Sequence, residues 1–104
     1  MTREDFCEAA LNELQRIEND EVTVELAAGD ILEGKVEYQT SSGWKILVFS
    51  DGDVWDYVRL MIPSTKEHFE IWPEKEDDDC EGFRKIRAYH PPADQLNAKW
   101  GFLA

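Results

Sequence analysis

The spacing of apolar residues changes near residue 20, and this change constrains the fold more than any other feature of the sequence. Over residues 3–18, apolar residues recur every three or four positions, which is the period of one face of an amphipathic helix. Over residues 22–26, every second residue is apolar, which is typical of a strand with one buried face. Each of these apolar faces needs a partner surface, so the sequence predicts a helix packed on a sheet.

Turn residues divide the rest of the chain into short segments. Gly29-Asp30 predicts a turn into an antiparallel partner strand over residues 31–38. Further strands are expected at 44–49, 57–62, 68–72 and 83–89, and a short helix at 93–99. The sequence therefore predicts one α+β domain over residues 1–104, in which an N-terminal helix packs on a twisted antiparallel meander of four to six strands, followed by a short C-terminal helix.

The charge balance predicts the class of partner. The chain contains 23 Asp and Glu against 11 Lys and Arg, a formal net charge of −12. A field of this sign repels nucleic acid and anionic membranes and speeds encounter with basic proteins. We therefore expect a basic protein partner, no direct nucleic-acid binding and no membrane contact. The alternative is that the charge only maintains solubility.

The cysteines and the hydropathy pattern bear on the cellular compartment. Cys7 and Cys80 are too few for a disulfide framework; Cys7 is expected in the core and Cys80 in an acidic loop. The sequence has no basic and apolar leader, and no apolar run approaches the roughly 18 residues of a spanning helix. These features predict a cytoplasmic protein.

Three carboxylates, Asp51, Asp53 and Asp56, lie within six residues of one another. Carboxylates on a turning loop are ligands that Ca²⁺ prefers, so one interpretation is a metal or small-ligand site on this turn. An EF-hand, however, has an oxygen ligand at its fifth position and Gly at its sixth, where this segment has Trp55 and Asp56. The other interpretation is a tight turn, which Asp and Gly favour. We assign no metal and no cofactor.

A second acidic run occupies residues 74–81, where six of eight side chains are carboxylates. One interpretation is a solvated loop. The other is an acidic binding surface that competes with nucleic acid for the Lys and Arg residues of a partner. The candidate partner-binding residues come from both acidic segments and include the tryptophan of the first. They are Asp51, Asp53, Trp55, Asp56, Glu76, Asp77, Asp78 and Asp79.

Trp55 follows the first acidic turn and lies between two carboxylates. It is either an exposed binding hot spot that meets an Arg or Lys of a partner, or a side chain that covers one end of the sheet. Most of the other large aromatic residues are expected in the core from the alternation of the strands. This group comprises Trp44, Phe49, Tyr57, Phe69, Trp72 and Trp100.

The sequence offers little for catalysis. His68 is expected to point outward from a strand, and His90 precedes two prolines in a connecting segment. Neither pairs with a nucleophile in a recognisable pattern, and the metal-ligand spacings and the glycine-rich nucleotide motifs are missing from the sequence. We therefore expect a protein that is not an enzyme.

The segment 43–57 resembles a pattern found in a family of small uncharacterised bacterial proteins. In that pattern Gly-Trp opens an apolar strand, an Asp-x-Asp turn follows, and an Asp-Tyr pair begins the next strand, as at Gly43-Trp44, 51–53 and Asp56-Tyr57. This chain departs from the pattern at Gly52, where a Cys is common. The resemblance implies a bacterial or prophage origin and an α+β hairpin core, and it implies no activity.

These observations favour a non-enzymatic, acidic interaction protein that binds and inhibits a basic, nucleic-acid-handling protein, as a phage anti-defence or immunity-type inhibitor does. One alternative is the metal- or small-ligand-binding module on the Asp51–Asp56 turn. Another is an accessory protein without an inhibitory role that forms homodimers through an exposed strand edge at 83–89.

Overall fold

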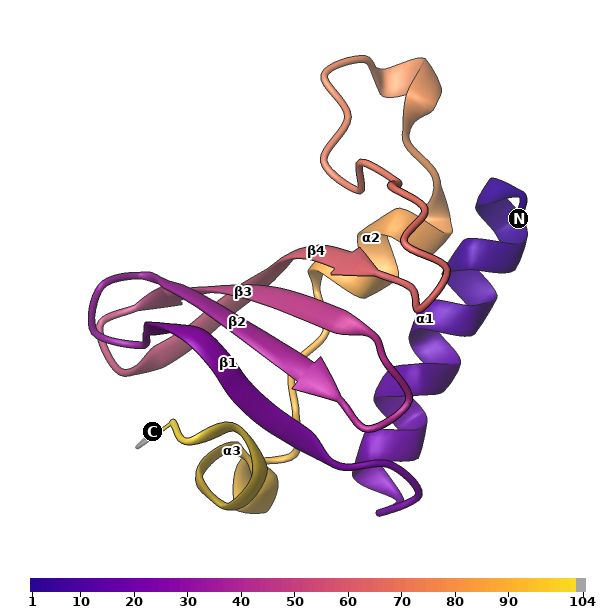
Figure 1. Ribbon diagram of the computed structural model, residues 1–104. Coiled ribbons are helices and arrows are strands. Elements are labelled where there is room, and N and C mark those ends of the chain that lie inside the picture. The colour runs from indigo at the N-terminus through magenta and orange to yellow at the C-terminus, as the bar shows by residue number, and fades with distance from the viewer. Residues whose placement is uncertain (103–104) are drawn as a thin grey trace.

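A four-stranded antiparallel sheet, with strand order β1-β2-β3-β4, lies at the centre of the protein (Figure 1). The computed structural model describes residues 1–102. Its elements are α1 (Arg3–Glu18), β1 (Val24–Asp30), β2 (Lys35–Thr40), β3 (Lys45–Asp51), β4 (Val54–Ile62), the 3-10 turn η1 (Glu76–Asp78), α2 (Glu81–Arg87) and α3 (Ala93–Trp100). The predicted α+β class, with an N-terminal helix, an antiparallel meander and a short C-terminal helix, is confirmed.

Helix α1 has the predicted bounds. The backbone N–H of Asp5 donates a 3.1 Å hydrogen bond to the hydroxyl of Thr2, which caps the helix, and the first turn carries two acids that favour this end of the helix dipole. Its apolar stripe is buried, as expected. Glu13 is buried on the same face, which the apolar spacing did not predict.

The turn between the first two strands lies later than predicted. Strand β1 continues through Gly29 to Asp30, and β2 begins at Lys35 instead of residue 31. The Asp30 carboxylate accepts a 2.8 Å hydrogen bond from the backbone N–H of Leu32, and this local bond turns the chain after Asp30. The expected strand at 31–38 is therefore shortened at its start.

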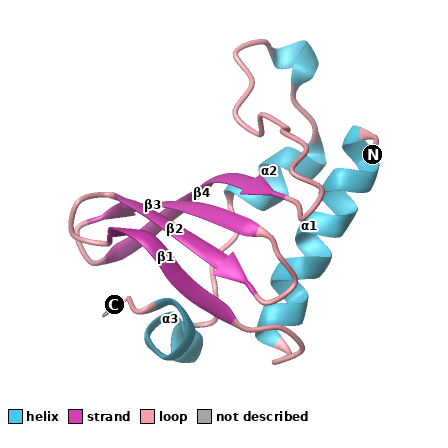
Figure 2. Cartoon of the chain, viewed as in Figure 1, coloured by secondary structure: helices cyan, strands magenta, loops and turns pink. Residues whose placement is uncertain are grey.

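One face of the sheet is buried against the helices. Helix α2 packs against α1 and β4, and α3 packs against β1, so the helices surround one side of the meander (Figure 2). The buried residues alternate along β2 and β3, whereas in β4 they are three positions apart because its pairing with β3 is irregular. They join the apolar stripe of α1 in a single core. They are Val36, Tyr38, Ile46, Val48, Trp55, Val58 and Met61.

Two predicted strands are wrong. Residues 68–72 form an irregular segment, and residues 83–89 mostly belong to helix α2. Phe83 and Ile86 are both buried and are three positions apart, which is a helical spacing, whereas in a strand they would point to opposite faces. The homodimer interpretation assumed an exposed strand edge at residues 83–89, and the structure has no strand there.

The C-terminal segment packs on the core. Helix α3 has nearly the predicted bounds, and Trp100 and Phe102 are buried. The hydroxyl of Tyr38 donates a 2.6 Å hydrogen bond to the backbone carbonyl of Trp100 and thereby joins the sheet to this segment. The apolar cluster of Trp100, Phe102 and Leu103 near the end of the sequence predicts packing of this segment, and Leu103 lies outside the described residues. Within residues 1–102, no helix has the length and apolar character needed to cross a membrane.

Candidate functional site

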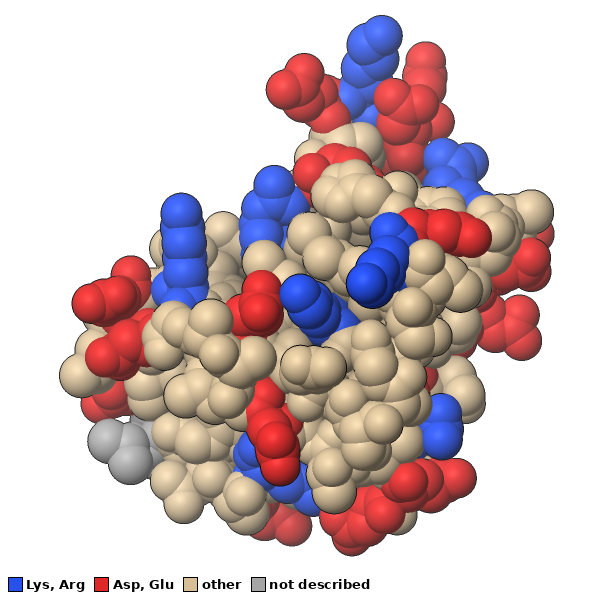
Figure 3. Space-filling model, viewed as in Figure 1, with Lys and Arg blue, Asp and Glu red and all other residues tan. Residues whose placement is uncertain are grey.

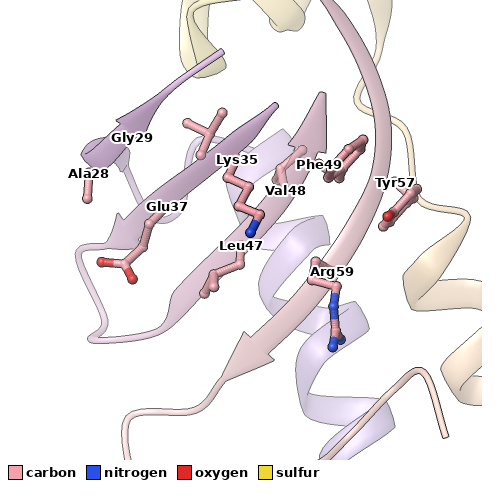
Figure 4. Close-up of a pocket in the computed structure, with 10 residues that line it drawn as sticks. Ala28, Gly29, Lys35, Glu37, Leu47, Val48, Phe49, Tyr57 and Arg59 are labelled. Carbon is pink, nitrogen blue, oxygen red and sulfur yellow. The ribbon is translucent and has the colours of Figure 1, made fainter. Parts of the chain in front are cut away.

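The face of the sheet opposite α1 is open and holds a shallow pocket of about 450 Å³ (Figure 4). In Figure 4, helix α1 lies behind the sheet, and the side chains that line the pocket stand on the other side. They come from all four strands. The lining includes Lys35, Glu37, Leu47, Phe49, Tyr57 and Arg59. This face is a concave, partly apolar surface that the helices leave uncovered.

A row of aromatic rings crosses this open face. The rings of Phe49 and Tyr57 are stacked, with centroids 5.2 Å apart and planes 8° apart. The ring centroids of Trp72 and Tyr57 are 4.8 Å apart. The Arg87 guanidinium also lies over the Trp72 ring, 4.8 Å from its centroid. The indole N–H of Trp72 donates a 3.1 Å hydrogen bond to the Val58 carbonyl, yet 39% of this residue remains exposed.

The placement of Phe49, Tyr57 and Trp72 corrects the expectation that they belong to the core. Phe49 alternates with buried Val48 and so points to the open face. Tyr57 reaches the same face because of an irregularity in the β3–β4 pairing: Ser50 pairs with Trp55, and Phe49 pairs with Tyr57. Asp56 is thus an extra residue in β4, and Trp55 and Tyr57 point to opposite faces although they are two positions apart.

Trp55 is buried, so the interpretation of this residue as an exposed binding hot spot is wrong. Only 2% of its surface is accessible. Its indole N–H donates a 2.9 Å hydrogen bond to the carbonyl of Tyr89, and its ring lies 4.9 Å from that of Trp100 and 5.5 Å from that of Phe102. Trp55 therefore joins one end of the sheet to the C-terminal segment and does not offer a surface to a partner.

The acidic turn borders one end of the aromatic row. Asp51 pairs with Val54 two residues beyond the Phe49–Tyr57 pair, so this β-hairpin turn is continuous with the open face. Asp51 and Asp56 are exposed and Asp53 is half-buried. Within residues 1–102, none of these three carboxylates forms an ion pair. No group of three or more potential ligands that could hold a metal ion occurs in this described part.

The second acidic segment projects from the other end of the molecule (Figure 1). Glu76, Asp77 and Asp78 are exposed on η1, and in the residues that the structure covers none of them has a cationic partner within 4.0 Å. The two acidic segments therefore do not form one continuous patch. In Figure 3 the middle of the open face is mainly uncharged with a few basic and acidic side chains, and further acidic side chains gather toward its margins.

Asp79 differs from its acidic neighbours because it has a structural role. Its carboxylate accepts hydrogen bonds from Arg87 at 2.8 and 3.2 Å and from Arg84 at 3.3 Å. The hydrogen bonds from Arg87, together with the charges of both guanidinium groups, lower the pKa of Asp79. Asp79 thus ties the projecting loop to α2 and leaves Glu76, Asp77 and Asp78 to face solvent.

One ion pair on the open face fixes a cation beside the aromatic row. Arg59 donates a 2.8 Å hydrogen bond to Glu70, and this bond is the main reason that the pKa of Glu70 is lowered. The backbone N–H of Trp72 donates a 3.0 Å hydrogen bond to the same carboxylate. Arg59 and Glu70 therefore hold Trp72 against Tyr57, a function that no sequence pattern indicated.

Comparisons with known proteins identify no relative: no family model matches the chain, and no curated protein and no solved structure is significantly similar to it. The resemblance of the segment 43–57 to a bacterial family stays a prediction.

Proposed function

We propose that this protein is a non-enzymatic binding protein whose open sheet face, together with the adjoining acidic turn, binds a basic protein. The observation that carries the proposal is the row of Phe49, Tyr57 and Trp72 on an uncovered sheet face. At one end it is bordered by carboxylates that form no ion pair within residues 1–102. Aromatic side chains of this kind supply most of the affinity at protein interfaces, because they bury a large area and lose little conformational entropy.

The charges favour a basic partner. Of the 11 Lys and Arg residues, six already form ion pairs with carboxylates of the described chain, namely Arg16, Arg59, Arg84, Lys85, Arg87 and Lys99. The net charge of −12 therefore acts outward mainly through unpaired acids. Such a field raises the association rate with a basic protein, while the apolar face sets the dissociation rate.

The projecting acids on η1 suit a partner with a large footprint. The molecule is about 36 Å long in its largest dimension, and the acidic turn and η1 lie at different ends of it. A partner that contacts both would present basic residues over an extended surface, as a nucleic-acid-handling protein does. Occupying that surface would block phosphate binding, which makes inhibition the proposed outcome.

The test begins with capture of partners from a host lysate at low and at high salt, followed by purification of the captured protein. Binding kinetics are then measured for F49A/Y57A, for D51N/D53N/D56N, and for the matched control E8Q/E21Q/D94N, whose acids are exposed on the helical side of the molecule. F49A/Y57A should weaken binding at least about tenfold at every salt concentration, because the lost contact is apolar.

The turn variant should slow association about tenfold at low salt, and this difference should shrink at high salt because screening weakens steering. The control carries the same change in net charge at other positions, and it should behave almost as the unmodified protein does. If the control slows association as much as the turn variant, the charge acts only globally and the proposed site is wrong. If F49A/Y57A binds normally, the open face is not the interface.

A further inference from the structure

The two cysteines, distant in the sequence, meet where α1 lies beside the start of α2. Cys7 is on the buried face of α1, and Cys80 directly precedes α2. Their sulfur atoms lie near one point, because both are within 4 Å of the position that a Cβ atom on Gly82 would occupy. Both thiols are free in this structure. No sequence pattern indicates this proximity, because 72 residues separate the two positions.

Gly82 leaves open the space that the two sulfur atoms share. A Cβ atom on Gly82 would lie 2.6 Å from the Sγ atom of Cys7 and 3.9 Å from that of Cys80. The first distance is too short for any side chain at this position unless Cys7 moves. The glycine is therefore required by the close approach of Cys7, and the sulfur atom of Cys80 borders the same position at 3.9 Å.

We propose that Cys7 and Cys80 are a reversible redox site that forms an intramolecular disulfide on exposure to a peroxide, which clamps the start of α2 to α1. Cys80 is half-buried and can be reached from solvent, whereas only 7% of Cys7 is exposed. Burial, reinforced by the neighbouring Cys80, raises the pKa of Cys7 to about 11, so its thiol stays protonated near neutral pH. Cys80 is accordingly the thiol that meets the oxidant.

The formation of each disulfide consumes one molecule of hydrogen peroxide and releases two molecules of water. The Cys80 thiolate attacks one oxygen of hydrogen peroxide; the O–O bond breaks, Cys80 becomes a sulfenic acid, and the leaving hydroxide takes up the proton released by the thiol to form water. The Cys7 sulfur then attacks the Cys80 sulfur, the S–O bond breaks, and the hydroxyl leaves as a second water with the Cys7 proton. Two electrons pass from the sulfur atoms to the peroxide, and a dithiol reductant reverses the change.

The disulfide would close a loop that includes the whole sheet and the projecting acidic segment. Cross-links that close long loops restrict the unfolded chain most, so oxidation should raise the melting temperature by at least about 5 °C. This site is independent of the proposed partner-binding face, since it lies between α1 and α2 and contains none of the aromatic row.

The test treats the purified, reduced full-length chain with a small excess of hydrogen peroxide and follows it by intact mass, alkylation and melting temperature. The expected product is a monomer that is about 2 Da lighter, resists alkylation, melts at a higher temperature and returns to the starting mass with dithiothreitol. C80S should show no such product, and its melting temperature in the reduced state verifies that it is folded.

G82A provides a second variant that retains both thiols. Its added methyl group would lie 2.6 Å from the Sγ atom of Cys7 and must displace that side chain. Disulfide formation should therefore slow at least tenfold, while each cysteine still reacts with an alkylating agent after unfolding. Intermolecular dimers or sulfinic acid as the main products of the unmodified protein would overturn the proposal. Disulfide formation at an equal rate in G82A and the unmodified protein would do so as well.

Discussion

Phe49 and Tyr57 stack across β3 and β4 with their ring planes 8° apart, while Trp55, two residues before Tyr57, points into the core. This relationship depends on the extra residue at Asp56, which reverses the alternation of β4 between Trp55 and Tyr57. The irregularity therefore places one aromatic residue on each face of the sheet. The Trp55 indole joins the C-terminal segment to the sheet, and the Tyr57 ring extends the row of rings on the open face.

Trp55→Ala should strongly destabilise the protein. The Trp55 side chain is only 2% exposed and donates a hydrogen bond to the Tyr89 carbonyl. Its removal should lower the free energy of unfolding by about 3–5 kcal/mol. Guanidinium unfolding followed by circular dichroism measures this loss. A cost below about 0.5 kcal/mol, as expected for a surface position, would show that Trp55 does not hold the C-terminal segment in place.

Trp72 should account for the quencher-accessible fluorescence. Its exposed fraction is 39%, whereas Trp44, Trp55 and Trp100 are at most 7% exposed. Acrylamide should therefore quench one class of emission readily in the unmodified protein, and W72F should lose that class while remaining folded. Undiminished quenching in W72F would mean that another indole is exposed and that the aromatic row is arranged differently.

Glu13→Ala should destabilise the protein although the residue is polar. Glu13 is 2% exposed, accepts a hydrogen bond from the Ser42 hydroxyl in the β2–β3 turn and pairs with Arg16 at 3.3 Å. Its loss leaves the Ser42 hydroxyl without this acceptor, and the expected cost is about 1–3 kcal/mol in urea unfolding. Glu8→Ala, on the exposed face of the same helix, is the control and should change stability by less than about 0.5 kcal/mol.

Acid should weaken the anchor of the projecting loop. Hydrogen bonds from Arg87 lower the pKa of Asp79 in the folded state, so the unfolded state binds more protons at this group in acid. The stabilisation is therefore complete above the unfolded-state pKa of about 3.9 and is lost as the pH falls through the lower folded-state value. Glu70, whose pKa Arg59 lowers, contributes in the same direction.

D79N should be less stable than the unmodified protein near neutral pH and should lose less stability between about pH 4 and pH 2. Melting curves recorded across this range provide the comparison. Parallel pH dependence of the two proteins would contradict the assignment of Asp79 as the charged anchor of the loop.

The parts of the fold that the sequence predicts well are those whose signal is local and repeated. Residues 3–18 contain four turns of regular apolar spacing and a capping threonine, and β1 to β4 are separated by glycine turns. Residues 83–89 offer only Phe83 and Ile86 as buried positions, and one such pair is too short a pattern to identify a helix before its packing on α1 and β4 is known.

The candidate site depends on features that a sequence pattern does not contain. Which face of an apolar strand is left uncovered depends on where α1 packs, so Leu47 and Phe49 look like core residues in the sequence. Asp51, Asp53 and Asp56 are identified from sequence as a turn near the site, but Asp79 looks like its acidic neighbours until Arg84 and Arg87 are placed beside it. The proximity of Cys7 and Cys80 is equally a product of the fold.

The central claim is that the open sheet face binds the partner, and an NMR footprint tests it most directly. The ¹⁵N-labelled protein is titrated with the purified basic protein captured from lysate, and backbone shift changes are mapped on the structure. The account predicts the largest changes in β3 and β4, at Leu47, Phe49 and Tyr57, and in the adjoining turn at Asp51 and Asp53. Changes confined to the exposed face of α1 or to α3, with β3 and β4 unaffected, would contradict it.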